Sequence, residues 1–372
     1  MKLYYPDFYP EFRCLAGSCP DSCCRQGWQI VLDDAHRDLY ASLPGELGQK
    51  VRGALTKNED GETVLRMEDG VCTLLRQDGL CPIAAALGED GLCHICHTHP
   101  RFIEEYGGTR EYHLSLSCPE AARLSLEREV PIRFLTEITE EEVTCPNEID
   151  PDEYMTLLSL RETALSIVQD RSLGIFDRMA LLLQLARRIQ PLMDEGRYGT
   201  CRSLLEVFPH NIVSGRMLAG SRRLRLKGTS WFPERELLLS LEHLTADFPT
   251  LLRQAVFTAR DGEDFDRACS LTMEHLLSLW LSHYIPKAVN DGHADTKIRL
   301  CVLLCLTVRR LCICQKTEAP ADAAKTAGLL AKELEHSEDN VSAVLSALEH
   351  PGWHEHLLMQ LPLPKKGAHH AV

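Results

Sequence analysis

The sequence lacks the features that mark several common classes of protein. It contains no run of 18 apolar residues, so we expect no transmembrane helix. Its N-terminus shows no basic region followed by an apolar stretch, which predicts a cytoplasmic protein. No Gly-x-Gly occurs among the 23 glycines, so the Gly-rich loop of a doubly wound nucleotide-binding fold is missing. A formal charge of −14 is unfavourable for binding nucleic acid.

Cysteine, in contrast, is abundant. The chain of 372 residues has 16 cysteines, and ten of them precede residue 146. Disulfides are rare in a reducing cytoplasm, where clustered cysteines more often bind metal or do chemistry. Hydrophobic residues make up 44% of the chain, which is enough for a sizeable core. We therefore ask what a globular protein does with so many reduced thiols near its N-terminus.

The length and the change in composition predict two domains and a mainly α fold. Residues 1–128 are rich in cysteine and short turns, which predicts a loop-rich, metal-binding N-terminal domain. Residues 129–150 are interpreted as a linker, residues 151–363 as an α-helical domain, and residues 364–372 as a disordered tail.

The helical domain has a clear start signal. Asp150 is placed to cap a helix, with Pro151 in the first turn and Glu153 three residues after the cap. Apolar residues then recur at helical spacing through 155–168 and 176–193. They recur again through 235–245, 265–285, 297–313, 322–333 and 341–349.

The N-terminal cysteines form a dense pattern. Four of them, Cys14, Cys19, Cys23 and Cys24, fall within eleven residues, and five more follow before residue 119. Soft thiolates favour zinc, copper(I) or iron–sulfur clusters. Isolated cysteines more often act as small buried hydrophobic residues, but a run of this density favours metal binding. The spacing leaves zinc and an iron–sulfur cluster both open.

Other patterns are weaker. Residues 93–97 match the attachment pattern of c-type haem, which needs an exported protein, and Cys19-x3-Cys23 lacks the third cysteine of a radical S-adenosylmethionine motif because residue 26 is Gln. His97 and His99 are candidate ligands, although a turn before Pro100 is the simpler interpretation. Cys301, Cys305 and Cys312 share one helical face and predict a core stripe. Cys145, Cys201, Cys269 and Cys314 are assigned no role.

The ordered series of N-terminal motifs resembles a known family, the flagellin lysine-N-methylases, also called FliB. The resemblance begins at residues 12–28 and continues through residues 79–82, 87–90, 96–102 and 114–123. The same region resembles the wider CxxCxxCC-type zinc- or iron-chelating domain. By position, the family's recurrent cysteines correspond to Cys14, Cys19, Cys23, Cys24, Cys72, Cys81, Cys96 and Cys118. Cys93 is an addition, and His97 stands where an arginine is more usual.

The resemblance implies an enzyme that uses S-adenosylmethionine to N-methylate lysine side chains of flagellin. It also implies an iron–sulfur cluster, with zinc as the alternative, held by some of these eight thiols. It implies neither a nucleic-acid partner nor a membrane, and it leaves the oligomeric state unknown. No residue of the helical half can be assigned from it.

The residues themselves support methyl transfer only weakly. Tyr4, Tyr5, Asp7, Tyr9 and Trp28 flank the first cysteines and could steer an amine or hold a sulfonium, although packing over the metal site is the simpler role. We therefore predict no catalytic residue. Two other interpretations stay open: a non-catalytic zinc- or iron-chelating module whose helical domain docks a partner, and a redox sensor that uses the vicinal pair Cys23-Cys24.

Overall fold

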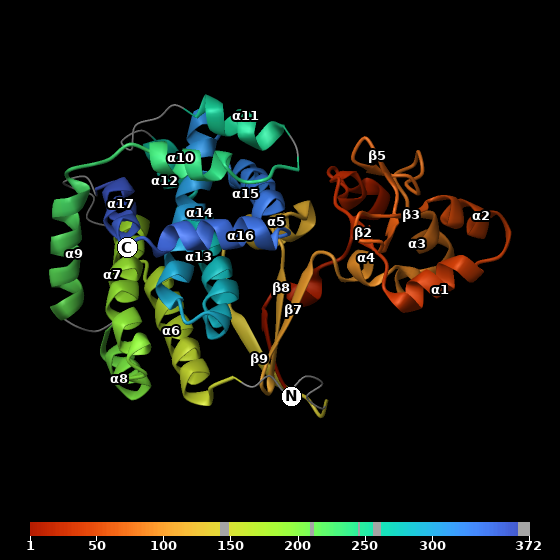
Figure 1. The fold of residues 1–372 in the computed structure, drawn as a ribbon. Coiled ribbons are helices and arrows are strands. Elements are labelled where there is room, and N and C mark those ends of the chain that lie inside the picture. The colour runs from red at the N-terminus through yellow and green to blue at the C-terminus, as the bar shows by residue number, and fades with distance from the viewer. Residues whose placement is uncertain (142–148, 209–211, 245, 256–261, 364–372) are drawn as a thin grey trace.

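The computed structural model has two lobes of unequal size. It describes residues 1–141, 149–208, 212–244, 246–255 and 262–363. Figure 1 shows a small lobe, built from most of the first hundred residues, beside a large lobe that is mainly helical. Within the described residues, no helix is long and apolar enough to cross a membrane.

A four-stranded sheet lies on the side of the large lobe that faces the small lobe (Figure 1). Its order is β7-β8-β1-β9, in which β1 pairs with β8 in parallel and the other pairs are antiparallel. The strands are β1 (Lys2–Pro6), β7 (Arg101–Tyr106), β8 (Thr109–Leu114) and β9 (Phe134–Ile138). Gly107 and Gly108 join β7 to β8, and Gly107 has φ +57°. A two-residue Gly-Gly turn suits the twist of such a hairpin.

The small lobe combines short strands and short helices around its own core. The core contains Ile30, Tyr40, Val51 and Ile83 together with two cysteines, Cys72 and Cys93. Strands β2, β4 and β3 form one sheet, and β5 and β6 form a hairpin. The elements are β2 (Ile30–Val31), α1 (Asp34–Ser42), α2 (Gly45–Gly53), β3 (Leu55–Lys57), β4 (Thr63–Leu65), β5 (Met67–Glu68), β6 (Val71–Cys72), α3 (Pro82–Leu87) and α4 (His94–Thr98).

The large lobe is a helical assembly around α14 (Ala294–Gln315). Residues 294–312 of this helix are all buried, and they include charged side chains such as Arg299, which pairs with Asp295. The other helices are α5 (Pro119–Leu126), α6 (Pro151–Gln169), α7 (Ile175–Asp194), α8 (Tyr198–Val207), α9 (Ile212–Arg225), α10 (Phe232–Leu239), α11 (Asp247–Gln254), α12 (Glu263–Ala268), α13 (Ser270–Tyr284), α15 (Pro320–Leu334), α16 (Glu338–Glu349) and α17 (Gly352–Gln360).

The predicted start of the helical region is confirmed. The Asp150 side chain caps α6 by accepting hydrogen bonds from the N–H groups of Asp152 (2.8 Å) and Glu153 (3.3 Å). Helices α7 and α14 cover the segments 176–193 and 297–313 whose apolar spacing predicted them. A helical C-terminal region is therefore what the periodicity indicated.

The N-terminal part differs from a purely loop-rich region because it contains several strands. Residues 1–128 also contribute to two cores. Phe8, Phe12 and residues 114–126 pack into the large core, whereas residues 30–93 supply the small one. The segment 129–150, predicted as a linker, contains β9, which pairs with β1. Residues 142–148, with Cys145, and the predicted tail 364–372 lie outside the described residues.

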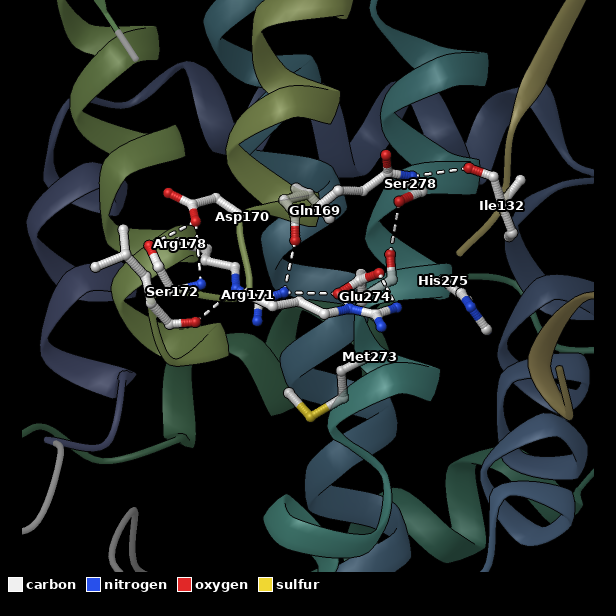
Figure 2. A network of polar contacts seen from close by, with 12 residues as sticks. Ile132, Gln169, Asp170, Arg171, Ser172, Arg178, Met273, Glu274, His275 and Ser278 are labelled. Atoms are coloured by element: carbon white, nitrogen blue, oxygen red, sulfur yellow. Dashed lines mark hydrogen bonds and ion pairs between the residues drawn. The ribbon is translucent and has the colours of Figure 1, made fainter. Parts of the chain in front are cut away.

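A buried ionic network fastens the segment before β9 to the helices (Figure 2). Glu274 of α13 accepts hydrogen bonds from Arg171 (3.0 Å) and Arg178 (2.7 Å). Gln169 donates to the carbonyl of Ile132 at 2.8 Å. An imidazole nitrogen of His275 lies 2.9 Å from the carbonyl of Val130. The network ties residues 130–132 to α6, α7 and α13.

The cysteines of the helical half belong mainly to the core. Cys301, Cys305 and Cys312 are fully buried in α14, as their shared face predicted. Cys201 and Cys269 are also fully buried, and Cys314 packs against the core while remaining partly exposed. Burial raises the pKa of all six thiols, which keeps them protonated and unreactive.

Candidate functional site

The cysteines that the N-terminal motifs single out lie in and beside the small lobe. Cys14 and Cys19 lie in the loop that enters the lobe, and Cys23 and Cys24 form a single 3₁₀ turn that ends at Arg25. Cys72 ends β6, and Cys96 lies in α4. Cys81 and Cys118 directly precede α3 and α5. Of these thiols, Cys24, Cys72, Cys81 and Cys96 pack in or against the small core.

Two of these thiols stand at the starts of helices for a simple sequence reason. In both Cys81-Pro82 and Cys118-Pro119, the cysteine takes the capping position and the proline takes the first helical position. Proline suits that position because the missing N–H is not needed there. Burial raises the pKa of both thiols, and the unpaired N–H groups of the first helical turn oppose that rise.

The loop that carries the first cysteines is held by close backbone contact. A Cβ on Gly17 would lie 2.9 Å from the carbonyl oxygen of Asp78, and one on Gly79 would lie 3.2 Å from the carbonyl oxygen of Gly17. Gly79 also has φ +77°. Glycine is needed at both positions because any side chain would push this loop away from the turn at residues 76–80.

A second anchor ties the loop to the large lobe. The Asp21 carboxylate accepts a hydrogen bond from the Gln26 amide (2.6 Å) and forms a salt bridge with Lys332 of α15. Trp28 packs against the imidazole rings of His99 and His336, with ring centroids 5.0 and 4.5 Å away, and the two imidazoles lie 5.6 Å from each other. The cysteine-bearing loop therefore lies against α15 and the residues that follow it.

Two pairs of neighbouring thiols share a proton by hydrogen bonding. The hydrogen bond between the Cys23 and Cys24 thiols lowers the pKa of Cys24 and raises that of Cys23. In the same way, the hydrogen bond with Cys96 lowers the pKa of Cys93 and raises that of Cys96. In each pair the hydrogen bond favours ionisation of one sulfur, and the thiolate is the form that binds soft metals.

Electrostatic repulsion between the thiolates shows which of them are neighbours. Burial raises the pKa of Cys19 and Cys118, the hydrogen bond with Cys24 raises that of Cys23, and the nearby Cys14 sulfur adds to all three rises, so these four thiols form one group. A second group lies in the small core and contains Cys24, Cys72, Cys81, Cys93 and Cys96. The vicinal pair Cys23-Cys24 joins the two groups.

The thiols are chemically suited to a soft metal, but their side chains are not arranged around one metal ion. All 15 described cysteines are free thiols, so none of these donors is spent in a disulfide. Yet among the residues that the structure describes, no three His, Cys, Asp or Glu side chains converge as ligands of one metal ion. A metal or cluster would need these thiols to turn inward from their present positions.

Most of the five residues that flank the first cysteines lie outside the small core. Tyr4 is buried in the sheet against Phe134, with the Arg161 guanidinium 3.8 Å from its ring centre. Tyr5 donates a hydrogen bond to Glu137 (3.1 Å), and Tyr9 packs against Tyr112. Asp7 pairs with Arg128 at 3.0 Å. Of the five candidates, Trp28 alone packs against the small core, whereas Tyr9 packs against the large core, as Cys118 does.

The structure also brings in residues that motif reading did not select. Cys93 is fully buried among the matched thiols, and its Cys-x2-Cys spacing with Cys96 was the available signal. Lys332 and His336 come from the helical half, and no sequence pattern indicated their position beside residues 21 and 28. His97 forms a hydrogen-bond contact with the carbonyl of Glu89 (3.1 Å), whereas His99 packs on Trp28.

Comparison with known proteins places the chain in a family. Residues 161–360 match the family model described as the FliB lysine N-methylase C-terminal domain. Neither a curated protein nor a solved structure matches the chain. The match begins within α6 and ends with α17. It excludes the N-terminal thiols from Cys14 to Cys118, which we call the cysteine centre, so it is independent of the N-terminal motifs. Because it covers more than half of the 372 residues, the chain belongs to the FliB lysine N-methylase family.

Proposed function

We propose that this protein transfers methyl groups from S-adenosylmethionine to lysine side chains of flagellin in the cytoplasm. The observation that carries the proposal is the family match over residues 161–360. The N-terminal motifs at residues 12–28 and 114–123 support it separately, because they resemble the same family.

The reaction needs little from the protein beyond positioning. The lone pair of a neutral lysine amine attacks the methyl carbon, a C–N bond forms, and the C–S bond of the sulfonium breaks. S-adenosylhomocysteine leaves, and the amine gives up one proton to solvent or a neighbouring base. The enzyme must hold amine and methyl in line and favour the deprotonated amine.

The fold implies that the methyl donor is held in an unusual way. The described strands include a single parallel pairing, that of β1 with β8, and nearly the whole small lobe lies between those two strands in the chain. This arrangement is unlike the doubly wound sheet in which nucleotide-like ligands lie at the carboxyl ends of parallel strands. The donor site is therefore expected elsewhere, in a concave polar surface.

We also propose that the cysteine centre holds an iron–sulfur cluster, with zinc as the alternative. The candidate ligands are Cys14, Cys19, Cys23, Cys24, Cys72, Cys81, Cys96 and Cys118, and the soft donor set supports the assignment. A bound cluster or metal would cross-link the entry loop, the small core and the start of α5, which adds stability to a lobe with a small core.

The test is a methyl-transfer assay on anaerobically purified full-length protein. We expect lysine mass increments of one or more methyl groups on flagellin after incubation with S-adenosylmethionine. Unmodified flagellin in the presence of a metal-loaded, folded protein would contradict the proposal. That result would instead support a non-catalytic metal-binding module whose helical lobe docks a partner.

A further inference from the structure

A small cavity lies where the four-stranded sheet meets the helices of the large lobe. The space open to the centre of a water-sized sphere is about 20 Å³. It is bounded by β7, β8, α13 and the residue that follows α15, elements that Figure 1 labels on the large lobe. Its polar lining is His113, Trp280, His283 and Glu335, and Phe102 and three leucines form the rest.

His283 brings a buried polar group without a protein partner to this cavity. The residue is only 8% exposed, and its Nδ1 has no hydrogen-bond partner within the part of the chain that the structure describes. The rings of Phe102 and His113 pack against it, with centroids 5.1 and 4.9 Å away. Burial lowers the pKa of His283 well below its usual range, so the imidazole is neutral and carries one donor and one acceptor nitrogen. Buried polar groups are nearly always paired with protein or with ordered water.

Glu335 offers a second polar group in the lining. Its Oε2 accepts a hydrogen bond from the Ser115 hydroxyl at 2.6 Å, and its Oε1 accepts one from the indole N–H of Trp280 at 3.0 Å. The backbone N–H of Leu116 also donates to this carboxyl group. A carboxylate has about four lone-pair sites, so Glu335 can accept one further hydrogen bond.

The size and the lining of the cavity together indicate its ligand. A buried water needs about 10–15 Å³ of such space and about three polar partners. The cavity exceeds that volume by little, so it has room for one water and none for an organic molecule. Among the described residues, no three His, Cys, Asp or Glu side chains converge on one metal ion, which disfavours a metal. Water also suits a neutral imidazole, because it both donates and accepts hydrogen bonds.

We propose that one ordered water binds in this cavity and bridges the imidazole of His283 and the carboxyl group of Glu335. The water donates one hydrogen to Glu335 and pairs with a ring nitrogen of His283. The bridge joins α13 to the end of α15, and through the Ser115 hydroxyl it reaches the segment that follows β8. The site goes beyond methyl transfer, because it depends on neither a substrate nor a metal.

The bridge belongs to a chain of polar groups that leads to the junction of the two lobes. The hydroxyls of Ser115 and Ser117 lie 3.1 and 2.8 Å from Nε2 of His336. His336 in turn packs on Trp28 of the small lobe. The water therefore extends this chain from the junction into α13, and its role is to hold the carboxyl group of Glu335 in place.

The first test is a crystal structure of the full-length protein at a resolution that shows ordered waters. We expect one isolated density peak within about 2.7–3.2 Å of both a ring nitrogen of His283 and a carboxyl oxygen of Glu335. A cavity without such a peak overturns the proposal. Density for an ion or for a larger molecule also overturns it, because the cavity would then bind something other than water.

The second test counts long-lived waters in solution by oxygen-17 magnetic relaxation dispersion. His283→Phe removes both ring nitrogens and places a larger ring in the cavity, so we expect one long-lived water fewer than in the wild type. Glu335→Gln keeps an acceptor oxygen in place and is expected to retain the water. Equal counts for the wild type and His283→Phe would contradict the proposal.

The matched control is His350→Phe, at an exposed position directly after α16, which should leave the water count unchanged. Circular dichroism spectra show whether the variants fold. The wild-type crystal structure decides the question even if His283→Phe fails to fold, because it needs no variant.

Discussion

The indole ring of Trp28 packs on the imidazole ring of His336, with 4.5 Å between the ring centroids. Trp28 belongs to the small lobe, and His336 follows α15 in the large lobe. The salt bridge between Asp21 and Lys332 lies on the same side of the junction. These contacts set the position of the cysteine-bearing loop relative to the family's helical domain.

Removing the indole ring of Trp28 should weaken the packing between the small lobe and the large lobe. We expect Trp28→Ala to lower the free energy of unfolding of the small lobe by about 2 kcal/mol, because a half-buried aromatic ring loses its packing. Chemical denaturation followed by circular dichroism should then show an earlier transition for that lobe. Phe232→Ala, which removes a ring that is 58% exposed, is the control and should change stability by about 0.5 kcal/mol or less. Equal effects of the two substitutions would contradict this role for Trp28.

The network around Glu274 should be sensitive to loss of its carboxylate (Figure 2). Glu274→Ala leaves the guanidinium of Arg178, only 5% exposed, without its counter-charge. We expect a loss of about 3–5 kcal/mol in unfolding free energy, measured by urea denaturation. Arg171→Ala removes a partner that is 48% exposed, so it should cost about 1 kcal/mol or less. A mild effect of Glu274→Ala would show that water reaches Arg178.

The stability of the large lobe should fall in acid because of His354. Burial lowers the pKa of this histidine to about 4, and neither ring nitrogen has a hydrogen-bond partner. Its pKa in the unfolded chain is about 6.5, so the unfolded state binds more protons between these values. The contribution is complete above about pH 6.5 and is lost as the pH falls toward 4. Within that window the unfolding free energy falls by up to about 1.4 kcal/mol for each pH unit.

The measurement is the unfolding free energy of wild-type protein and of His354→Leu at several pH values from 4.5 to 7. We expect the variant to show a shallower decline, because leucine does not titrate. Parallel curves for the two proteins would mean that other groups cause the acid sensitivity.

Replacing the vicinal thiols should remove bound metal. Cys23→Ser with Cys24→Ser takes away the Cys24 sulfur, whose ionisation the hydrogen bond favours, and the link between the two thiol groups. We expect most of the iron or zinc to be lost, as measured by elemental analysis and, for an iron–sulfur cluster, by visible absorption. Cys314→Ser, at a partly exposed position in the helical lobe, should retain it. Unchanged metal content in the double variant would show that other thiols hold the metal.

Long periodic segments were the most predictable part of the fold. Helix α6 begins where Asp150 and Pro151 signal a start, and α14 coincides with its apolar stretch, because both depend on neighbours along the chain. The hairpin β7–β8 was not predicted, although Gly107-Gly108 was an available turn signal. Helices α1 and α2 were also missed, since nine-residue helices depend mostly on tertiary packing.

The candidate site was predictable in composition and not in arrangement. The series of thiols from Cys14 to Cys118 could be read from the sequence, whereas only the structure shows that Cys24, Cys72, Cys81 and Cys96 pack in or against one small core. The salt bridge between Asp21 and Lys332 was not indicated, because Lys332 lies in α15, 311 residues after Asp21. Spacing within one segment carries no information about such a pairing.

The sequence by itself determined the soft donor chemistry, the helical character of the second half and the core position of Cys301 and Cys305, since these follow from residue type and local periodicity. Only the tertiary structure decided that residues 1–128 divide between two cores and that Trp28 meets His336. The physical reason is that burial of apolar surface rewards any close packing, so which distant segments meet depends on the shape of the whole chain.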